Sequence, residues 1–176
     1  IIFLISCNML DGINLQSFIF YVTNFVFLFF IQENLLILSI IFSLIIFALL
    51  NFNGKIFLGD SGVYLISILL GVFYIKYYNL NIGSLNSDVI FSILLFPVLD
   101  ATRCISLRIF KGKNPFEGDR KHFHHLLLKK YSVVNSLFIL TGLILIPFII
   151  FVSNLSVYYS LLITTFYYFF FVLRLS

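Results

Sequence analysis

Residues 35–73 decide the fold, and they read LLILSIIFSLIIFALLNFNGKIFLGDSGVYLISILLGVF. An apolar run long enough for a membrane span ends in a short polar hinge, Gly54 to Asp60, and a second apolar run follows. A charged side chain at the centre of a membrane helix costs roughly 2.5–3.5 kcal/mol, so it usually has a partner or a task. The stretch therefore predicts two spans with a functional carboxylate, Asp60, at the start of the second.

The composition extends this picture to the whole chain. Of its 176 residues, 61% are apolar and 10% are charged, and the mean hydropathy is +1.12, whereas a soluble domain is about 45–50% apolar and about 25% charged. We expect an all-α polytopic integral membrane protein that forms a single membrane-embedded domain over residues 1–176, with about six full transmembrane helices plus an N-terminal partial one. The expected spans are 16–32, 35–51, 61–78, 88–108, 133–153 and 155–173, after the stub Ile1–Cys7.

The basic residues are distributed unevenly. Seven of the eleven Lys and Arg lie within residues 108–130, between two apolar runs. Cytoplasmic loops carry such an excess, so we expect the loop at about 109–132 to be cytoplasmic. The cluster contains no nucleic-acid-binding motif, and no nucleic-acid partner is expected. Counting spans backwards from this loop places Asp11, Asp60, Asp100 and the histidines at the same membrane face.

Two motifs on this face are rich in oxygen ligands. Asn8, Asp11 and Asn14 recur at every third residue, and carboxylate and amide oxygens are the ligands that Mg²⁺ accepts. A helix cap followed by a turn is an equally open interpretation of this motif. In the second motif, Gly59 precedes Asp60, and glycines let the backbone approach a ligand closely. An Asp placed there is expected to hold a cation that in turn holds phosphate.

A third motif lies inside a predicted span. Asp100 and Arg103 are three residues apart, which makes them neighbours on a helix and predicts an intramembrane ion pair. Asp100 is also a candidate to orient a neighbouring basic or histidine side chain.

The segment 114–125, NPFEGDRKHFHH, contains all three histidines of the chain. Asp119 is the expected N-cap of a helix that runs to Lys130. Three interpretations stay open: an amphipathic helix on the membrane surface, a zinc site that needs further ligands because neither Cys is expected nearby, and anion recognition. We favour the third, in which Arg, Lys and His side chains bind a diphosphate.

Together these blocks resemble the polyprenyl-phosphate N-acetylhexosamine-1-phosphate transferase family (glycosyltransferase family 4), which includes undecaprenyl-phosphate GlcNAc-1-phosphate transferases and is related to phospho-N-acetylmuramoyl-pentapeptide transferase. The resemblance covers residues 8–128 in the same order. It implies a multi-pass enzyme of the bacterial cytoplasmic membrane, a phosphoglycosyl transferase that moves an N-acetylhexosamine 1-phosphate from a UDP-sugar to undecaprenyl phosphate. UMP would be released, and the product would initiate a cell-envelope polysaccharide.

The resemblance also implies roles for individual residues. Asp60 would ligate Mg²⁺ (or Mn²⁺), Asp11 would be an active-site carboxylate near the metal, and Phe57 would stack on the uracil. The candidate catalytic residues are Asp11, Asp60, His124 and His125, and the candidate substrate-binding residues are Asn8, Phe57, Gly59, Asp100, Asp119, Arg120, Lys121 and His122. Membrane lipid is an expected partner, and a homodimer stays open.

The chain also departs from the family's pattern. The family carries an adjacent pair of aspartates in its N-terminal half, and these 176 residues contain no such pair. Asn14 stands where many relatives have a second Asp, and Leu15 where they often have Gly. We therefore expect the chain to be the C-terminal part of a longer transferase and to be inactive alone. The alternatives are a non-catalytic remnant or subunit, and an ion-coupled membrane transporter.

Overall fold

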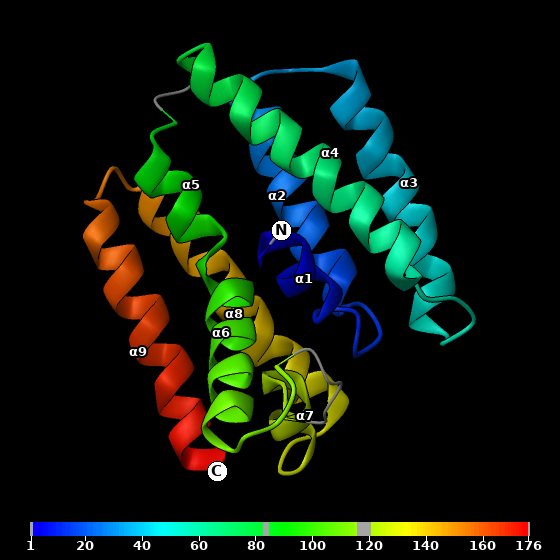
Figure 1. Cartoon of the computed structure of the whole chain (residues 1–176). Helices are drawn as coiled ribbons and strands as arrows, with labels where there is room; N and C mark the ends of the chain where they lie inside the picture. The colour runs from blue at the N-terminus through cyan, green and yellow to red at the C-terminus, as the bar shows by residue number, and fades with distance from the viewer. Residues whose placement is uncertain (1, 83–84, 116–120, 176) are drawn as a thin grey trace.

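The computed structural model describes residues 2–82, 85–115 and 121–175, and the elements within these ranges are α-helices (Figure 1). The predicted all-α class is confirmed. The helices are α1 (Ile2–Asn8), α2 (Gln16–Ile31), α3 (Leu35–Phe52), α4 (Gly59–Asn79), α5 (Ser87–Ile93), α6 (Leu95–Phe110), α7 (Phe123–Leu128), α8 (Val133–Val152) and α9 (Val157–Leu175).

The six predicted spans are all helical, but they differ in length. Helices α3, α4, α8 and α9 have 18 to 21 residues and are apolar enough to cross a membrane. Helix α2 has 16 residues and is about 24 Å long, which is less than the roughly 30 Å of a bilayer's hydrocarbon core. The described helices therefore provide four candidate spans, or five if α5 and α6 count as one. This is a multi-pass membrane protein.

The segment predicted as one span over 88–108 is broken. Helices α5 and α6 meet at Leu94 with a bend of 64°. Pro97 lies in the first turn of α6 and has no N–H to donate to the carbonyl of Ile93, and its ring would clash with that carbonyl if α5 continued straight. The predicted span is therefore not one continuous helix, because the proline separates two helices that together are long and apolar enough for one broken span.

Buried polar side chains join α2 to α4. The Tyr21 and Ser67 hydroxyls are 2.7 Å apart, and the Tyr74 hydroxyl donates to Asn24 Oδ1 at 2.7 Å. Hydrogen bonds between membrane helices contribute about 0.6 kcal/mol on average. These bonds fix the rotation of α4 about its axis, and so they fix the direction of its first turn, which carries Asp60.

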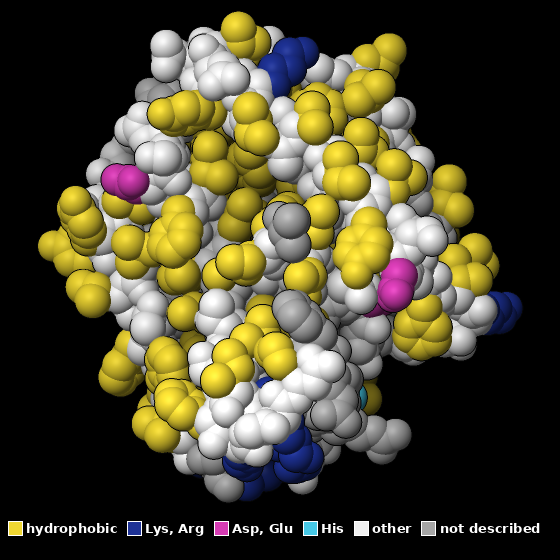
Figure 2. Space-filling view, viewed as in Figure 1, with side chains coloured by type: hydrophobic (Ala, Val, Ile, Leu, Met, Phe, Trp, Pro, Cys, Tyr) yellow, Lys and Arg dark blue, Asp and Glu magenta, His cyan; other side chains and the backbone are white. Residues whose placement is uncertain are grey.

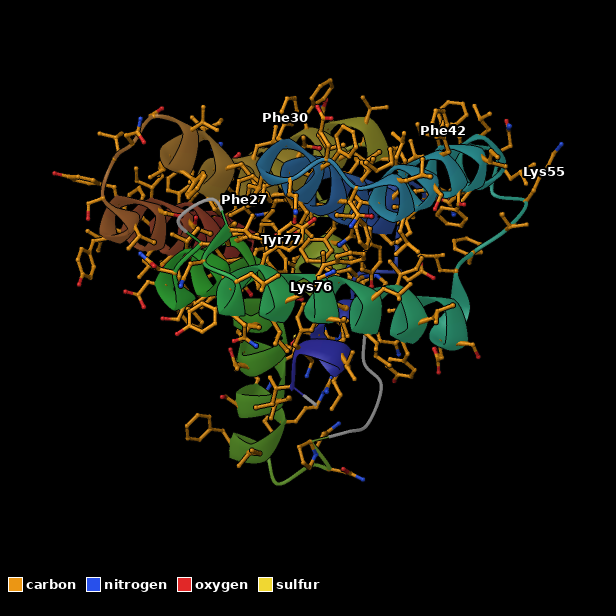
Figure 3. All side chains as sticks on the ribbon, turned by 90° about the horizontal axis from the view of Figure 1, so that it is seen from above. Phe27, Phe30, Phe42, Lys55, Lys76 and Tyr77 are labelled. Atoms are coloured by element: carbon orange, nitrogen blue, oxygen red, sulfur yellow. The ribbon has the colours of Figure 1, made fainter. Side chains whose placement is uncertain are left out.

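Aromatic side chains separate the interior of the bundle from its periphery. In the end-on view of Figure 3, Phe27 and Tyr77 point between the helices, while Phe30 and Phe42 point outward. Tyr77 is fully buried, whereas Phe30 is 84% exposed. Apolar side chains also cover much of the face in Figure 2, and Lys and Arg gather at its lower end. Exposed apolar side chains with charges at one end are expected of a bundle surrounded by lipid.

Three connections lie at the same end of the bundle, which is the lower end in Figure 1. They are residues 9–15, residues 53–58 and the described parts of 111–122, and we call this end the site end. Helix α7 packs here against α8 and α9. Contacts described below link Asp11, Gly59, Asp100 and the histidines at this end. The predicted gathering of these motifs at one end is confirmed.

Candidate active site

Asp11 connects the first two motifs. Its Oδ2 accepts a hydrogen bond from the backbone N–H of Gly59 at 3.1 Å, and its Oδ1 accepts one from the Ser17 hydroxyl at 2.8 Å. Gly59 has a φ of +62°, a conformation that glycine adopts without the steric cost of a Cβ. This conformation lets α4 begin beside Asp11, so the next residue, Asp60, starts its helix at the edge of the same site.

Gly12 connects the first motif to the histidines. A Cβ on Gly12 would lie 2.1 Å from Nε2 of His124, so the backbone approaches the imidazole more closely than any other residue type would allow. The His124 ring is 3% exposed, and within the described residues its Nε2 has no hydrogen-bond partner. Burial, reinforced by the neighbouring His125, lowers the pKa of His124 to about 3. His124 is therefore a neutral imidazole at neutral pH.

Asp100 is the centre of the third motif. The predicted pair exists: Arg103 Nη2 donates to Asp100 Oδ1 at 2.8 Å. Asp100 Oδ2 also lies 3.0 Å from His122 Nδ1, and the carboxylate accepts the backbone N–H of Phe123 at 3.1 and 3.2 Å. Asp100 thus orients a histidine and anchors the start of α7. The sequence led us to expect the first of these roles.

The helix predicted from Asp119 to Lys130 is shorter than expected. Helix α7 covers Phe123–Leu128, and its N-terminal flanking residue, His122, is extended with φ of −60° and ψ of 154°. The prediction that Asp119 caps this helix is wrong, because the helix begins four residues later and Asp100 accepts its first N–H instead. Asp119 and Arg120 themselves lie outside the described residues.

Two of the open interpretations of this segment fit the structure poorly. Phe123 and Leu127 are almost completely buried, so α7 packs inside the protein and does not lie on a membrane surface. Cys104 lies 3.4 Å from His122 Nδ1, contrary to the expectation that neither Cys is nearby, and Asp100, Cys104 and His122 are close enough to share a metal ion. However, Arg103 and Arg108 also contact this group, and their positive charges oppose a cation there.

Comparison with characterised proteins adds to this geometry. The chain is 30% identical over 95 residues to the undecaprenyl-phosphate alpha-N-acetylglucosaminyl 1-phosphate transferase of Yersinia pestis, and 32% identical over 105 residues to the protein of that name from Thermotoga maritima. It is 33% identical over 91 residues to the decaprenyl-phosphate N-acetylglucosaminephosphotransferase of Mycolicibacterium smegmatis. The resemblance to this transferase family is confirmed.

The matches cover part of each protein. They include 54%, 59% and 45% of this chain, and 26%, 34% and 22% of the Yersinia, Thermotoga and Mycolicibacterium transferases, respectively. The matched part of the chain therefore spans about a third or less of the length of these transferases. No protein-family model matches the chain, and no solved structure matches it.

The positions that the resemblance assigns to metal and nucleotide lie at the rim of the site end. The side chains of Asp60 and Phe57 are exposed, the latter by 55%, and no hydrogen bond from a described residue engages the Asp60 carboxylate. Asn8 ends α1 and its carbonyl accepts the N–H of Asp11 at 3.4 Å. His125 is partly buried and its ring lies 4.2 Å from that of His124.

These residues fit a magnesium ion that is held mainly by substrate. Mg²⁺ is commonly bound by one or two carboxylates, with waters and substrate phosphates as the remaining ligands. Asp60 provides an exposed carboxylate that makes no hydrogen bond with a described residue. Asp11 lies nearby, because it accepts a hydrogen bond from Gly59, the residue directly before Asp60. The two residues would hold the ion, which would neutralise charge on a bound diphosphate.

Sequence reasoning missed several members of the transferase-like site. Tyr168 of α9 donates to Asp100 at 2.8 Å, and Ser17 of α2 donates to Asp11. Arg108 is 3% exposed and donates to the carbonyl of Pro115 at 2.8 Å, although its place in the basic cluster suggested a solvent-facing charge. Leu15 has a φ of +69°, a backbone conformation that favours glycine over residues with a side chain. No sequence motif marks Tyr168 among the ten tyrosines.

Proposed function

We propose that the protein transfers an N-acetylhexosamine 1-phosphate from a UDP-sugar to undecaprenyl phosphate in the bacterial cytoplasmic membrane, releasing UMP. In this proposal, the present chain supplies the metal-binding and nucleotide-sugar side of the site. The observation that carries the proposal is the convergence of three motifs far apart in sequence: Asp11 with Gly59, Gly12 with His124, and Asp100 with His122. The similarity to the GlcNAc-1-phosphate transferases supports it.

In the proposed mechanism, catalysis consists largely of positioning and charge neutralisation. Asp60 and Asp11 would hold Mg²⁺, which would supply charge neutralisation at the diphosphate. Phe57 offers an exposed ring on which the uracil stacks. His125 and Lys121, which flank the buried His122 and His124, bind the diphosphate and the sugar. The close approach of Gly12 to His124 and the hydrogen bond from Gly59 to Asp11 keep these groups close together.

The structure gives less support to an ion-coupled transporter. Asp100 accepts hydrogen bonds from Arg103, Tyr168 and the Phe123 backbone and is fully engaged, so it is poorly suited to bind and release an ion. Transporters also commonly pair broken helices in two related halves. Within the described residues, one broken helix pair is present, α5 and α6.

Asp60→Asn tests the proposal most directly. The assay uses the protein as its gene encodes it, in membranes supplied with a UDP-N-acetylhexosamine, undecaprenyl phosphate and Mg²⁺, and it measures UMP release. We expect release to fall by at least 100-fold, because the amide removes the charge that holds the metal. The matched control is Asp88→Asn, since Asp88 is an exposed carboxylate in the first turn of α5 at the opposite end of the bundle.

The control should retain wild-type release. Equal release by wild type and Asp60→Asn would contradict the metal role. No release by the wild type, together with unaltered folding, would support the non-catalytic alternative. Substrate-coupled ion flux without UMP release would support the transporter.

A further inference from the structure

Tyr168 lies in the last helix, far from the sequence motifs, yet its hydroxyl belongs to the Asp100 network. The hydroxyl donates to Asp100 Oδ1 at 2.8 Å and accepts from Arg103 Nε at 2.6 Å. Tyr168 is fully buried, and its ring packs against Phe123 with 5.0 Å between the ring centroids. The ring therefore fills space, while the hydroxyl lies between the two charges of α6.

Asp100 and Arg103 both contact the backbone at residues 121–123, where the histidine segment begins. Arg103 Nη2 donates to the carbonyl of Lys121 at 2.6 Å, and Asp100 binds the His122 ring and the Phe123 N–H. Three consecutive residues, 121 to 123, are thus fixed by one aspartate and one arginine. A change in the direction of either side chain would move the segment that follows.

The Tyr168 hydroxyl bonds both of these side chains. Without it, Arg103 Nε would lose its acceptor in a partly buried site, and Asp100 Oδ1 would lose one of its donors. Unpaired buried polar groups are destabilising, so Arg103 would reorient toward other acceptors. Because Arg103 also binds Lys121, its reorientation would release the first anchor of the histidine segment.

We propose that Tyr168 is a positioning residue of the active site, through which α9 sets the orientation of His122 and the start of α7. The inference rests on the proposed function, in which this segment binds the diphosphate and sugar. A segment that is displaced but chemically intact should bind the UDP-sugar more weakly. The loss should therefore appear mainly in KM for the UDP-sugar.

The test compares Tyr168→Phe with wild type in the full protein. The substitution keeps the ring against Phe123 and removes only the hydroxyl. We expect KM for the UDP-sugar to rise about 5- to 20-fold with kcat changed less than threefold, a loss equivalent to about 1–2 kcal/mol. Tyr167→Phe is the matched control, since the Tyr167 ring packs against Phe171 instead and its hydroxyl lies beside Gly142.

A second measurement does not depend on transfer. In protein labelled with ¹⁵N-histidine, the ring nitrogens of His122, assigned by loss of their signals in His122→Asn, report the hydrogen bond from Nδ1 to Asp100. Tyr168→Phe should shift these signals, and Tyr167→Phe should leave them in place. If wild type shows no UMP release but the signals shift, the proposed function fails and the positioning role stands.

The contrary result is equally clear. Unchanged His122 signals and an unchanged KM in a folded Tyr168→Phe protein would overturn the inference, whatever the effect on thermal stability. If Tyr168→Phe does not fold, Arg103→Lys removes the same bond from the other side, since lysine lacks the Nε donor. It should shift the same signals, and an unshifted spectrum would again contradict the role.

Discussion

Gly12 is the residue at which the first motif meets the histidines, and it gives the sharpest prediction for a single side chain. In Gly12→Ala the new methyl group would overlap the His124 ring. We expect the buried ring to be displaced, with a loss of stability of about 1–3 kcal/mol from overpacking, and UMP release should fall. Thermal unfolding in detergent and the transfer assay measure the two effects.

A helical glycine with free space around it provides the control. A methyl group at Gly71 would have no neighbour within 4 Å beyond the backbone of its own helix, so Gly71→Ala should be neutral or slightly stabilising. His124→Ala in the Gly12→Ala background should restore part of the lost stability, because the overlapping ring is gone. Equal effects of the two glycine substitutions would show that the contact is not tight.

His124 makes stability depend on pH. In the unfolded chain its pKa is about 6.5 and in the folded protein burial lowers it to about 3. Above pH 6.5 both forms are neutral and His124 has no effect. Below that pH the unfolded chain takes up the proton first, so stability should fall by about 1.4 kcal/mol per pH unit until about pH 3.

Unfolding of the wild type and of His124→Gln at pH 7 and pH 5 measures this dependence. The variant should lose less stability between the two values, whatever its stability at pH 7. His125→Gln, which changes the more accessible neighbouring ring, should keep most of the wild-type dependence. Parallel pH profiles of wild type and His124→Gln would disprove the effect.

At the scale of elements, α2 and α4 are joined by polar bonds inside an apolar bundle. A double-mutant cycle on Asn24→Ala and Tyr74→Phe isolates one of them. We expect a coupling free energy of about 0.6–1.7 kcal/mol in detergent or bicelles. Tyr78→Phe, which changes a tyrosine 46% exposed on the same helix, should show no coupling to Asn24→Ala. Zero coupling for Tyr74 would mean that apolar packing alone sets the orientation of α4.

Helix positions were predictable because long apolar runs leave few alternatives in a membrane. The break between α5 and α6 and the N-terminal cap of α7 were less predictable than the helix positions. Pro97 lies inside the predicted span 88–108, but whether a proline kinks a helix or separates two depends on how neighbouring helices satisfy the freed carbonyls. Asp119 has the right side chain for a cap, yet the N–H that begins α7 is satisfied by Asp100, 23 residues before it in the sequence. Local sequence does not determine which carboxylate accepts that N–H.

At the scale of the whole molecule, the same distinction applies to the site. Asp11, Asp60, Asp100 and the histidines could be grouped because each belongs to a motif and the number of spans between them sets their membrane face. The connections Ser17–Asp11 and Tyr168–Asp100 depend on the rotation and packing of whole helices. Those properties follow from three-dimensional contacts that no short motif reports.

The shared site end also predicts membrane topology. Lys55→Cys and Lys113→Cys are each made in a variant that lacks Cys7 and Cys104. Both new cysteines should react with an impermeant maleimide only from the cytoplasmic side. A cysteine at Asn154, in the α8–α9 connection, should react only from the opposite side. Labelling of intact spheroplasts and of inside-out vesicles distinguishes the two. Reaction of Lys55→Cys and Lys113→Cys from opposite sides would contradict a common site.

The network around Asp100 has a consequence for the order of events during biosynthesis. Tyr168 follows Asp100 by 68 residues and Arg103 by 65, so at about 5–20 residues per second it is synthesised about 3–14 s later. During that interval the charged side chains of Asp100 and Arg103 lie in or near the membrane without the hydrogen bonds that Tyr168 later makes to them. Their spacing within one helix lets them pair at once. We therefore expect the local Asp100–Arg103 pair to form early, and the histidine segment to reach its final position only after the last helix inserts.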